Sequence, residues 1–178
     1  MTRVPVAIPV TGPARSLVFI GLGANLGDLT QTLSQALSRL AALPQTRLQA
    51  VSSTYRSAPV DACGPEYLNA VACLGTALEP LELLAHLHTF ERAQGRERPF
   101  FNAPRTLDLD MLLYGQLQLQ TERLTLPHPR LQHRAFVLLP LLELAPDLAP
   151  PNLGSLKNFL PAVADQAIVR LDQKLNFI

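Results

Sequence analysis

Two aspartates interrupt an apolar segment in the second half of the chain. Asp108 and Asp110 alternate with leucines in the run LDLDMLL, residues 107–113. In a strand, alternate side chains point to the same face, so the two carboxylates would lie ~7 Å apart on one side. Like charges repel at that distance and are costly to bury unless a cation or an arginine neutralises them. The pair indicates Mg²⁺ held with water and substrate phosphate, with a solvated face of an edge strand as the alternative.

Arginines are concentrated around this pair. Thirteen of the 15 basic residues are arginine, and seven of them lie between positions 92 and 134. A guanidinium is a planar fork of donors that stays charged, which suits phosphate and carboxylate groups. Arg96, Arg98 and Arg105 precede the acids, and a metal ion with arginines is the combination that neutralises a polyphosphate. The cluster favours phosphate recognition, with a solvated charged face as the alternative.

Histidines add a weaker signal. His128 stands between Pro127 and Pro129, where it is either a phosphate donor or a turn residue. His86 and His88 would point apart on a helix, so we expect no zinc site.

The glycine-rich segment GLGANLG, residues 21–27, follows an apolar run. A dinucleotide-binding loop would need a glycine where Leu26 stands. Gly21, Gly23 and Gly27 are therefore expected to shape a tight turn between a strand and a helix. Anion binding at the start of that helix is the weaker possibility.

Hydrophobic periodicity and turn signals assign these residues to helices, strands and loops. A helix capped by Asp28 should run to about Leu40, with Pro44 at its exit. The broken segment 55–67 is expected to be a functional loop. The turn at 114–116 predicts a hairpin. The expected strands are 17–22, 48–54, 69–76, 107–113, 117–120 and 168–171, and the further expected helices are 80–94 and 134–144. Together they indicate an α+β sandwich with helices on the faces of the sheet.

Composition places the chain among single-domain globular proteins. Its 178 residues are 48% apolar and 16% charged, which excludes bulk disorder. Residues 1–16 are expected to be a flexible leader and residues 17–178 one domain. No apolar run is long enough to cross a bilayer, and a net charge of +1 argues against duplex nucleic acid, so neither is an expected partner. Cys63 and Cys73 are too few for a disulfide framework and fit a reducing cytoplasm.

Longer motifs occur in a fixed order along most of the chain. They are FIGLGANLGD (19–28), SSTYRSAP (52–59), PEYLNA (65–70), GRER (95–98) and APRTLDLDMLLY (103–114), followed by residues 124–128 and 134–136. In order and spacing they resemble the 6-hydroxymethyl-7,8-dihydropterin pyrophosphokinase family. The resemblance implies a ferredoxin-like αβα sandwich with a mostly antiparallel sheet. It also implies transfer of the β,γ-diphosphate of ATP to the hydroxymethyl group of the pterin, with release of AMP, in folate biosynthesis.

The resemblance further implies roles for individual residues. Asp108 and Asp110 would bind two Mg²⁺ ions together with ATP, and Arg96 and Arg105 would stabilise the transferred group. The implied ATP-binding residues are His88, Glu91, Arg98, Met111, Arg123, Thr125 and His128. The implied pterin-binding residues are Ser57, Ala58, Val60, Tyr67, Asn69, Arg134 and Phe136, with the two aromatics enclosing the ring and Asn69 binding its amide edge. Without the resemblance, the aromatics would be assigned to the core and Asn69 to a turn.

The chain departs from the family in its arginine-rich loop. It contains no tryptophan, and Phe100 or Phe101 could supply the aromatic lid that closes over the substrates. An enzyme that acts as a cytoplasmic monomer is the expected form. The alternative is a nucleotide- or pterin-binding module without turnover, which the altered loop would support. A third possibility, a ferredoxin-like interaction domain, would bind no ATP.

Overall fold

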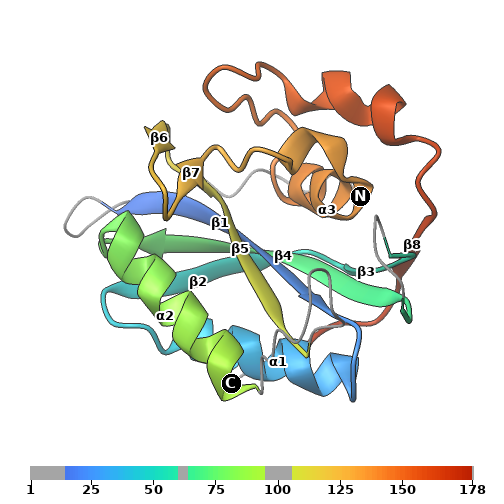
Figure 1. Cartoon of the computed structure of the whole chain (residues 1–178), viewed down its shortest axis with the longest axis horizontal. Coiled ribbons are helices and arrows are strands. Elements are labelled where there is room, and N and C mark those ends of the chain that lie inside the picture. Colours follow the sequence, from blue (N-terminus) through green and yellow to red (C-terminus); the bar gives the residue numbers. More distant parts are fainter. Residues whose placement is uncertain (1–14, 60–63, 95–105, 178) are drawn as a thin grey trace, which may run out of the picture.

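The computed structural model describes residues 15–59, 64–94 and 106–177, so all but two residues of the expected leader lie outside it. In chain order (Figure 1) the elements are β1 (Ser16–Ala24), α1 (Leu29–Ala41), β2 (Thr46–Val51), β3 (Thr54–Ser57), β4 (Tyr67–Thr76), α2 (Pro80–Ala93), β5 (Asp108–Tyr114), β6 (Leu119–Gln120), β7 (Thr125–Leu126), the 3₁₀ helix η1 (Leu131–His133), α3 (Ala135–Leu144), the 3₁₀ helix η2 (Leu156–Val163) and β8 (Ile168–Leu171). Within these residues, no helix is long and apolar enough to cross a membrane.

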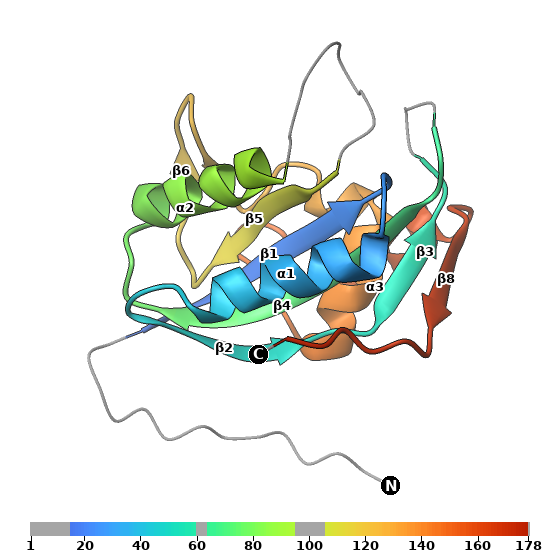
Figure 2. The ribbon, with the colours of Figure 1, turned by 90° about the horizontal axis from the view of Figure 1, so that it is seen from below.

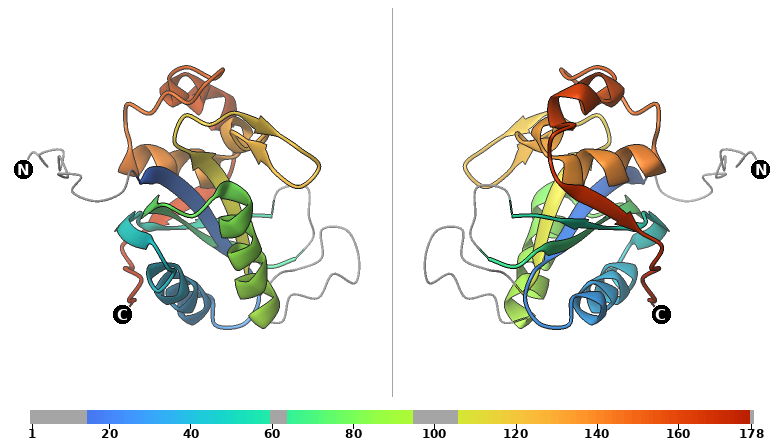
Figure 3. Two further views of the ribbon diagram at one scale, coloured as in Figure 1. Left: turned by 90° about the vertical axis from the view of Figure 1, so that its left-hand side faces the viewer. Right: turned by 90° about the vertical axis from the view of Figure 1, so that its right-hand side faces the viewer.

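The main sheet has the strand order β5-β1-β4-β3-β8, and β2 pairs with β4 alongside β3. Every pair in it is antiparallel. Figure 2 shows α1 and α2 in front of one face of this sheet, and Figure 3 shows α3 and the 3₁₀ helices on the opposite side. The expected α+β architecture, an antiparallel sheet with helices on its faces, is confirmed.

Two apolar cores lie on the two faces of the sheet. Because side chains alternate along a strand, Val18, Ile20 and Leu22 of β1 enter the core beneath α1 and α2. Phe19 of β1 and Val71 of β4 enter the second core, beneath α3. On the face beneath α3, polar site residues are therefore expected only where this apolar core does not cover the sheet.

Helix α1 forms where the sequence predicts it. The carboxylate of Asp28 accepts the backbone N–H of Gln31 at 3.0 Å, which caps the helix start. Leu33, Leu37 and Leu40 recur at helical spacing and are fully buried. Burying each leucine stabilises the fold by about 1.5–3 kcal/mol, so this stripe fixes α1 against the sheet.

The predicted hairpin between residues 107–113 and 117–120 is wrong. β6 pairs with β7 and does not join the main sheet. Other groups occupy the outer edge of β5, where a returning strand would have to pair. A carboxylate oxygen of Glu91 accepts one backbone N–H of β5, and the N–H of His128 donates to the carbonyl of Leu112 at 2.9 Å.

The predicted strand 48–54 is divided into β2 and β3. Ser52 lies between them: its backbone N–H donates to the carbonyl of Val71 at 2.9 Å, but its side-chain Oγ, not its carbonyl, accepts the N–H of Val71, also at 2.9 Å. The expected loop 55–67 is correspondingly shorter, because β3 and β4 extend into its two ends.

The glycines of residues 21–27 differ from the predicted turn. Gly21 and Gly23 lie inside β1, whereas Gly27, with a φ of +75°, adopts the left-handed conformation in the turn before α1. Glycine inside a strand is typical of a place where another group approaches the backbone closely. At Gly23 the nearest group is the side chain of Asn69, which is part of the candidate site.

Candidate active site

Asp108 and Asp110 lie at the start of β5 on one face of the sheet. They pair with Gly23 and Gly21 of β1, and both are half-buried. Leu109, between them, is 3% exposed and packs into the core beneath α1 and α2. The prediction that both carboxylates point to the same side of the strand is confirmed.

Glu91 of α2 reaches the backbone between the two acids. Its Oε1 accepts the N–H of Leu109 at 2.9 Å, and the residue is 1% exposed. Because β5 is an edge strand, this N–H points away from β1 and needs another acceptor. The contact fixes β5 at the acid pair, while the role of Glu91 at the nucleotide stays a prediction.

His128 lies beside the same edge of β5 and is neutral at pH 7. Its pKa is lowered to about 4 by burial first, then by the charges of Arg134 and Arg130, against a smaller opposing effect of Asp108. Its Nδ1 accepts the backbone N–H of Arg130 at 3.2 Å. In a neutral imidazole the proton must then be on Nε2, so His128 offers one N–H donor rather than a positive charge.

Asn69 is buried beside the acid pair. Its Nδ2 donates to the carbonyl of Tyr55 at 3.2 Å and to Oγ of Ser57 at 2.9 Å. These bonds use both amide hydrogens and leave Oδ1 as the acceptor. A Cβ on Gly23 would lie 3.3 Å from this Oδ1 and 3.9 Å from the half-buried ring of Tyr67, so Gly23 leaves room for both side chains.

A cavity of about 240 Å³ opens between three segments of the chain. The end of β3 and the residues after it contribute Ser57, Ala58 and Pro59, the start of α3 contributes Ala135 and Phe136, and the start of β8 with the two residues before it contributes Gln166–Ile168. Three predicted pterin-binding residues, Ser57, Ala58 and Phe136, thus line the same cavity.

Arg134 connects this cavity with the histidine. Its guanidinium carbon lies 5.5 Å from the centroid of the Phe136 ring, within cation–π range. Its charge also contributes to the lowered pKa of His128. The cavity and the acid-histidine region are therefore neighbouring parts of one face.

The remaining predicted ATP-binding residues are less closely gathered. His88 on α2 and Arg123 before β7 are exposed, and Thr125 in β7 is half-buried. Both α2 and β7 contact β5, so these three flank the strand that carries the acids. The side chain of Met111 is 3% exposed and packs into the core on the opposite face. Outside the described residues lie Val60, Arg96, Arg98, Arg105, Phe100 and Phe101.

The two carboxylates of Asp108 and Asp110 suit magnesium better than zinc. In the parts of the chain that the structure describes, no group of three or more His, Cys, Asp or Glu side chains could hold a metal ion. Two carboxylates on a half-buried face leave the remaining coordination positions to water and phosphate oxygens, as Mg²⁺ prefers. A structural zinc site would need four protein ligands.

Sequence reasoning misses the cavity wall formed by Gln166, Ala167 and Ile168. It predicts the strand 168–171 but not its partner, which is β3, with Ser57 opposite Ile168. No local motif marks these residues, because the pairing joins positions more than a hundred residues apart. It also misses the pairing of Gly23 with Asn69, because the register between two strands is not marked by a local motif.

An α+β sandwich with an acidic pair, a neutral histidine and an apolar cavity on one face has the parts of a phosphoryl-transfer enzyme with a ring-shaped second substrate. The family described as "7,8-dihydro-6-hydroxymethylpterin-pyrophosphokinase (HPPK)" matches residues 19–146. The chain belongs to this family.

The alignments with curated relatives span most of this chain and nearly all of each relative. A protein of Pseudomonas aeruginosa named 2-amino-4-hydroxy-6-hydroxymethyldihydropteridine pyrophosphokinase is 46% identical over 155 residues, which are 86% of this chain and 96% of that protein. A protein of the same name from Haemophilus influenzae is 42% identical over 155 residues, 86% of this chain and 97% of that protein.

Solved structures show a similar fold. A crystal structure of HPPK-DHPS in complex with substrates has a TM-score of 0.69 at 11% identity and covers 84% of this chain. A structure of HPPK-DHPS from Plasmodium falciparum has a TM-score of 0.65 at 13% identity and covers 83% of this chain. This chain spans 43% and 45% of those two chains, so the likeness concerns the fold of one part of them.

Proposed function

We propose that this protein transfers diphosphate from ATP to the hydroxymethyl group of 6-hydroxymethyl-7,8-dihydropterin, giving the pterin diphosphate and AMP in folate biosynthesis. The observation that carries the proposal is the membership of the pyrophosphokinase family over residues 19–146. The placement of the acid pair, His128 and the cavity on one face supports it.

The cavity is the proposed pterin site. At about 240 Å³ it is smaller than most pockets for drug-sized ligands, about 300–1,000 Å³, and suits a bicyclic ring better than a whole nucleotide. Phe136 provides a stacking face. Asn69 donates to Oγ of Ser57, which lines the cavity, and its Oδ1 would accept an N–H from the ring. The pterin would thus be held by one aromatic face and one fixed acceptor.

The acid face is the proposed site of the triphosphate. Asp108 and Asp110 would hold Mg²⁺ through their carboxylate oxygens. When bound, Mg²⁺ neutralises phosphate charge and makes the β-phosphorus more electrophilic. The Nε2–H of His128 would donate to a phosphate oxygen, and Arg134 supplies positive charge between the two subsites. A bond from the hydroxymethyl oxygen to the β-phosphorus forms as the bond from that phosphorus to the AMP oxygen breaks, and the hydroxyl proton leaves to water.

Product analysis tests this proposal. The purified protein is incubated with ATP, Mg²⁺ and 6-hydroxymethyl-7,8-dihydropterin, and the nucleotides are separated by chromatography. We expect one AMP and one pterin diphosphate for each ATP consumed, and no AMP when the pterin is omitted. Production of ADP would contradict diphosphate transfer. Binding of both ligands without turnover would favour the module that binds nucleotide or pterin.

We also propose that the protein acts as a magnesium-dependent monomer in the cytoplasm. The buried free thiol of Cys73 is compatible with a reducing compartment. Light scattering after size-exclusion chromatography should give a mass near 19.4 kDa. A mass twice as large would contradict the monomer.

A further inference from the structure

The third wall of the cavity comes from the C-terminal part of the chain. Gln166, Ala167 and Ile168 line it, and they lie beyond residues 19–146, which the family match covers. Of the three, Gln166 has a side chain that can form directed hydrogen bonds. Both polar atoms of its amide form hydrogen bonds within the protein.

The Gln166 amide bridges the two residues on either side of Arg134. Its Oε1 accepts the backbone N–H of Ala135 at 2.8 Å, and its Nε2 donates to the backbone carbonyl of His133 at 2.9 Å. The partners fix the orientation of the amide, because an N–H requires the oxygen and a carbonyl requires the nitrogen. One side chain thus holds both sides of the chain that leads into α3.

This contact replaces the capping that α3 lacks locally. Arg134 occupies the N-cap position of α3, and its side chain makes no capping hydrogen bond. The first N–H groups of a helix need acceptors from outside the helix. Gln166 supplies one to Ala135 from a residue 31 positions away, so the start of α3, including Phe136, depends on the C-terminal segment.

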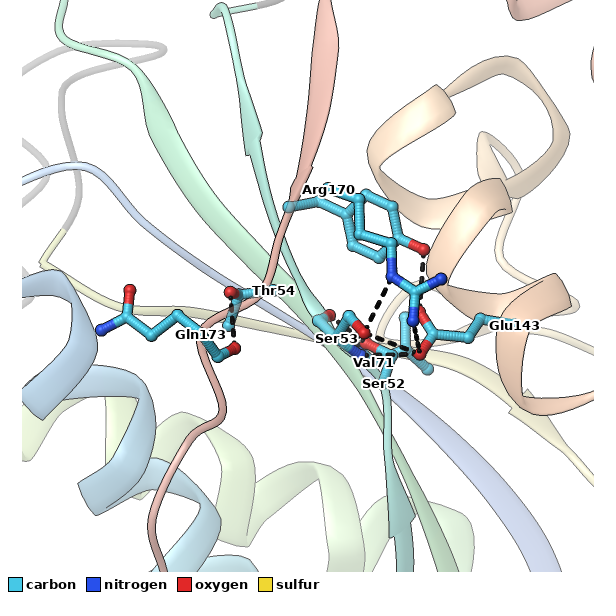
Figure 4. A network of polar contacts seen from close by, with 8 residues as sticks. Ser52, Ser53, Thr54, Val71, Glu143, Arg170 and Gln173 are labelled. Atoms are coloured by element: carbon cyan, nitrogen blue, oxygen red, sulfur yellow. Dashed lines mark hydrogen bonds and ion pairs between the residues drawn. The ribbon is translucent and has the colours of Figure 1, made fainter. Parts of the chain in front are cut away.

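The C-terminal segment is itself firmly attached to β3 and to the far end of α3. Ile168 pairs with Ser57, and the N–H of Ala58 donates to the carbonyl of Ala167 at 3.3 Å. Figure 4 shows the next anchor, where Arg170 donates to Oε1 of Glu143 at 3.3 Å. Gln166 therefore extends from a fixed strand, and it can hold the start of α3 at a set distance from β3.

We propose that Gln166 is a positioning residue for the pterin subsite. By bridging His133 and Ala135 it holds the Phe136 ring, with the Arg134 guanidinium over it, in the cavity that Ser57 also lines. In this role it acts through its two hydrogen bonds to the backbone and needs no contact with the ring. This inference rests on the proposed function, since it assigns the cavity to the pterin.

Two variants and a matched control test the inference. Gln166→Glu keeps the shape and the acceptor for Ala135 but removes the donor to His133, and Gln166→Ala removes both contacts. The control, Gln173→Ala, removes a glutamine of the same segment whose Nε2 donates to Thr30 Oγ1 at 2.9 Å, in a contact with α1. For each full-length protein, calorimetry measures the affinity for the pterin in the presence of Mg²⁺ and a nonhydrolysable ATP analogue, and the affinity for the analogue alone.

Both Gln166 variants should raise the dissociation constant of the pterin about tenfold and leave that of the ATP analogue within about twofold. The Gln173 variant should change neither affinity. Unchanged pterin binding in both Gln166 variants would overturn the inference. So would a parallel loss of pterin and nucleotide affinity with a lowered unfolding temperature, because that is the result of a general structural role. Failure of the wild-type protein to bind the pterin would instead overturn the proposed function, and the inference with it.

Discussion

Gly23 and Gly21 occupy alternate positions of β1, but a side chain would meet different surroundings at each. At position 23 a Cβ would lie 3.3 Å from Oδ1 of Asn69, which is a tight contact, whereas at position 21 the nearest atom belongs to Leu112 at 3.5 Å. Gly23→Ala should therefore displace the Asn69 amide and weaken pterin binding about tenfold, equivalent to roughly 1.4 kcal/mol.

Calorimetric titration with the pterin checks this, with Gly21→Ala as the matched control. The control should keep the pterin affinity within about twofold. Equal losses in the two variants would show that the methyl group acts on the strand and not on Asn69.

Asp110 allows a test of the acid pair. Asp110→Asn keeps the shape of the side chain and removes the charge that would hold Mg²⁺. The rate of AMP release should fall at least about 100-fold, since charged groups aimed at a transferring phosphoryl group have effects of this size. The unfolding temperature should change little, because the variant relieves repulsion between two like charges.

The matched control is Asp147→Asn, which alters an exposed aspartate paired with Lys157 at 2.8 Å. It should turn over at the wild-type rate. A near-normal rate for Asp110→Asn at saturating Mg²⁺ would refute the metal assignment.

For single residues, the sequence predicts the features that depend only on positions close together in the chain. The shared face of Asp108 and Asp110 follows from the two-residue period of a strand, and the structure confirms it. The contact of Gly23 with Asn69 depends on the register between β1 and β4. No local pattern encodes that register, so the sequence alone predicts a turn for Gly21 and Gly23.

At the scale of elements, one polar network joins α3, β3 and β8 (Figure 4). Oε1 of Glu143 accepts the N–H and the hydroxyl of Ser53 at 3.0 and 2.9 Å, and Oε2 accepts the hydroxyl of Tyr55 at 2.8 Å. Burial alone would raise the pKa of Glu143, but these hydrogen bonds and the charge of Arg170 outweigh it and lower the pKa below its ordinary 4.5. The carboxylate therefore stabilises the fold above about pH 4.5, and this contribution is lost as the pH falls below that value.

Tyr55→Phe tests the network. The pKa of Tyr55 is raised well above its ordinary 10.0, first by burial and then by the hydrogen bond to Glu143 and its charge. The unfolded chain loses this proton near pH 10 while the folded protein keeps it, so the stabilisation is complete below pH 10 and is lost as the pH rises further. The variant should lower the free energy of unfolding by about 1–3 kcal/mol at pH 7.

Urea denaturation at a series of pH values measures both effects. The variant should show a shallower loss of stability above pH 10 than the wild-type protein. An identical alkaline profile in the two proteins would mean that Tyr55 does not bind the carboxylate in solution.

The sequence predicts a helix well where a single apolar stripe determines it. α1 and α2 lie within a few residues of the expected helices. The hairpin after β5 was wrong because a glycine turn between apolar runs specifies a reversal but not the partner strand. β6 pairs with β7 because α2 and the backbone of His128 already occupy the edge of β5.

At the scale of the molecule, the C-terminal segment packs against β3 and against the core beneath α1 and α2. The hydroxyl of Thr54 donates to the carbonyl of Gln173 at 3.1 Å, and Leu175 is 8% exposed in the core beneath α1 and α2. Leu175→Ala should lower the free energy of unfolding by about 2–3 kcal/mol and leave the turnover of the folded protein unchanged.

Phe177→Ala provides the control, because Phe177 is 43% exposed. Its effect on thermal unfolding should stay within about 0.5 kcal/mol. A smaller effect for Leu175 than for Phe177 would contradict the packing of this segment into the core. Sequence patterns cannot reveal such long-range closure, because a single leucine in a polar stretch has no periodic neighbours.

A crystal structure with Mg²⁺, a nonhydrolysable ATP analogue and 6-hydroxymethylpterin would show whether the acid pair and the cavity act as one site. We predict metal ions within about 2.0–2.1 Å of oxygens of Asp108 and Asp110, with the pterin ring between Ser57 and Phe136. Metal ions bound elsewhere, or a pterin ring on the opposite face of the sheet, would show that the acid pair and the cavity do not form one site.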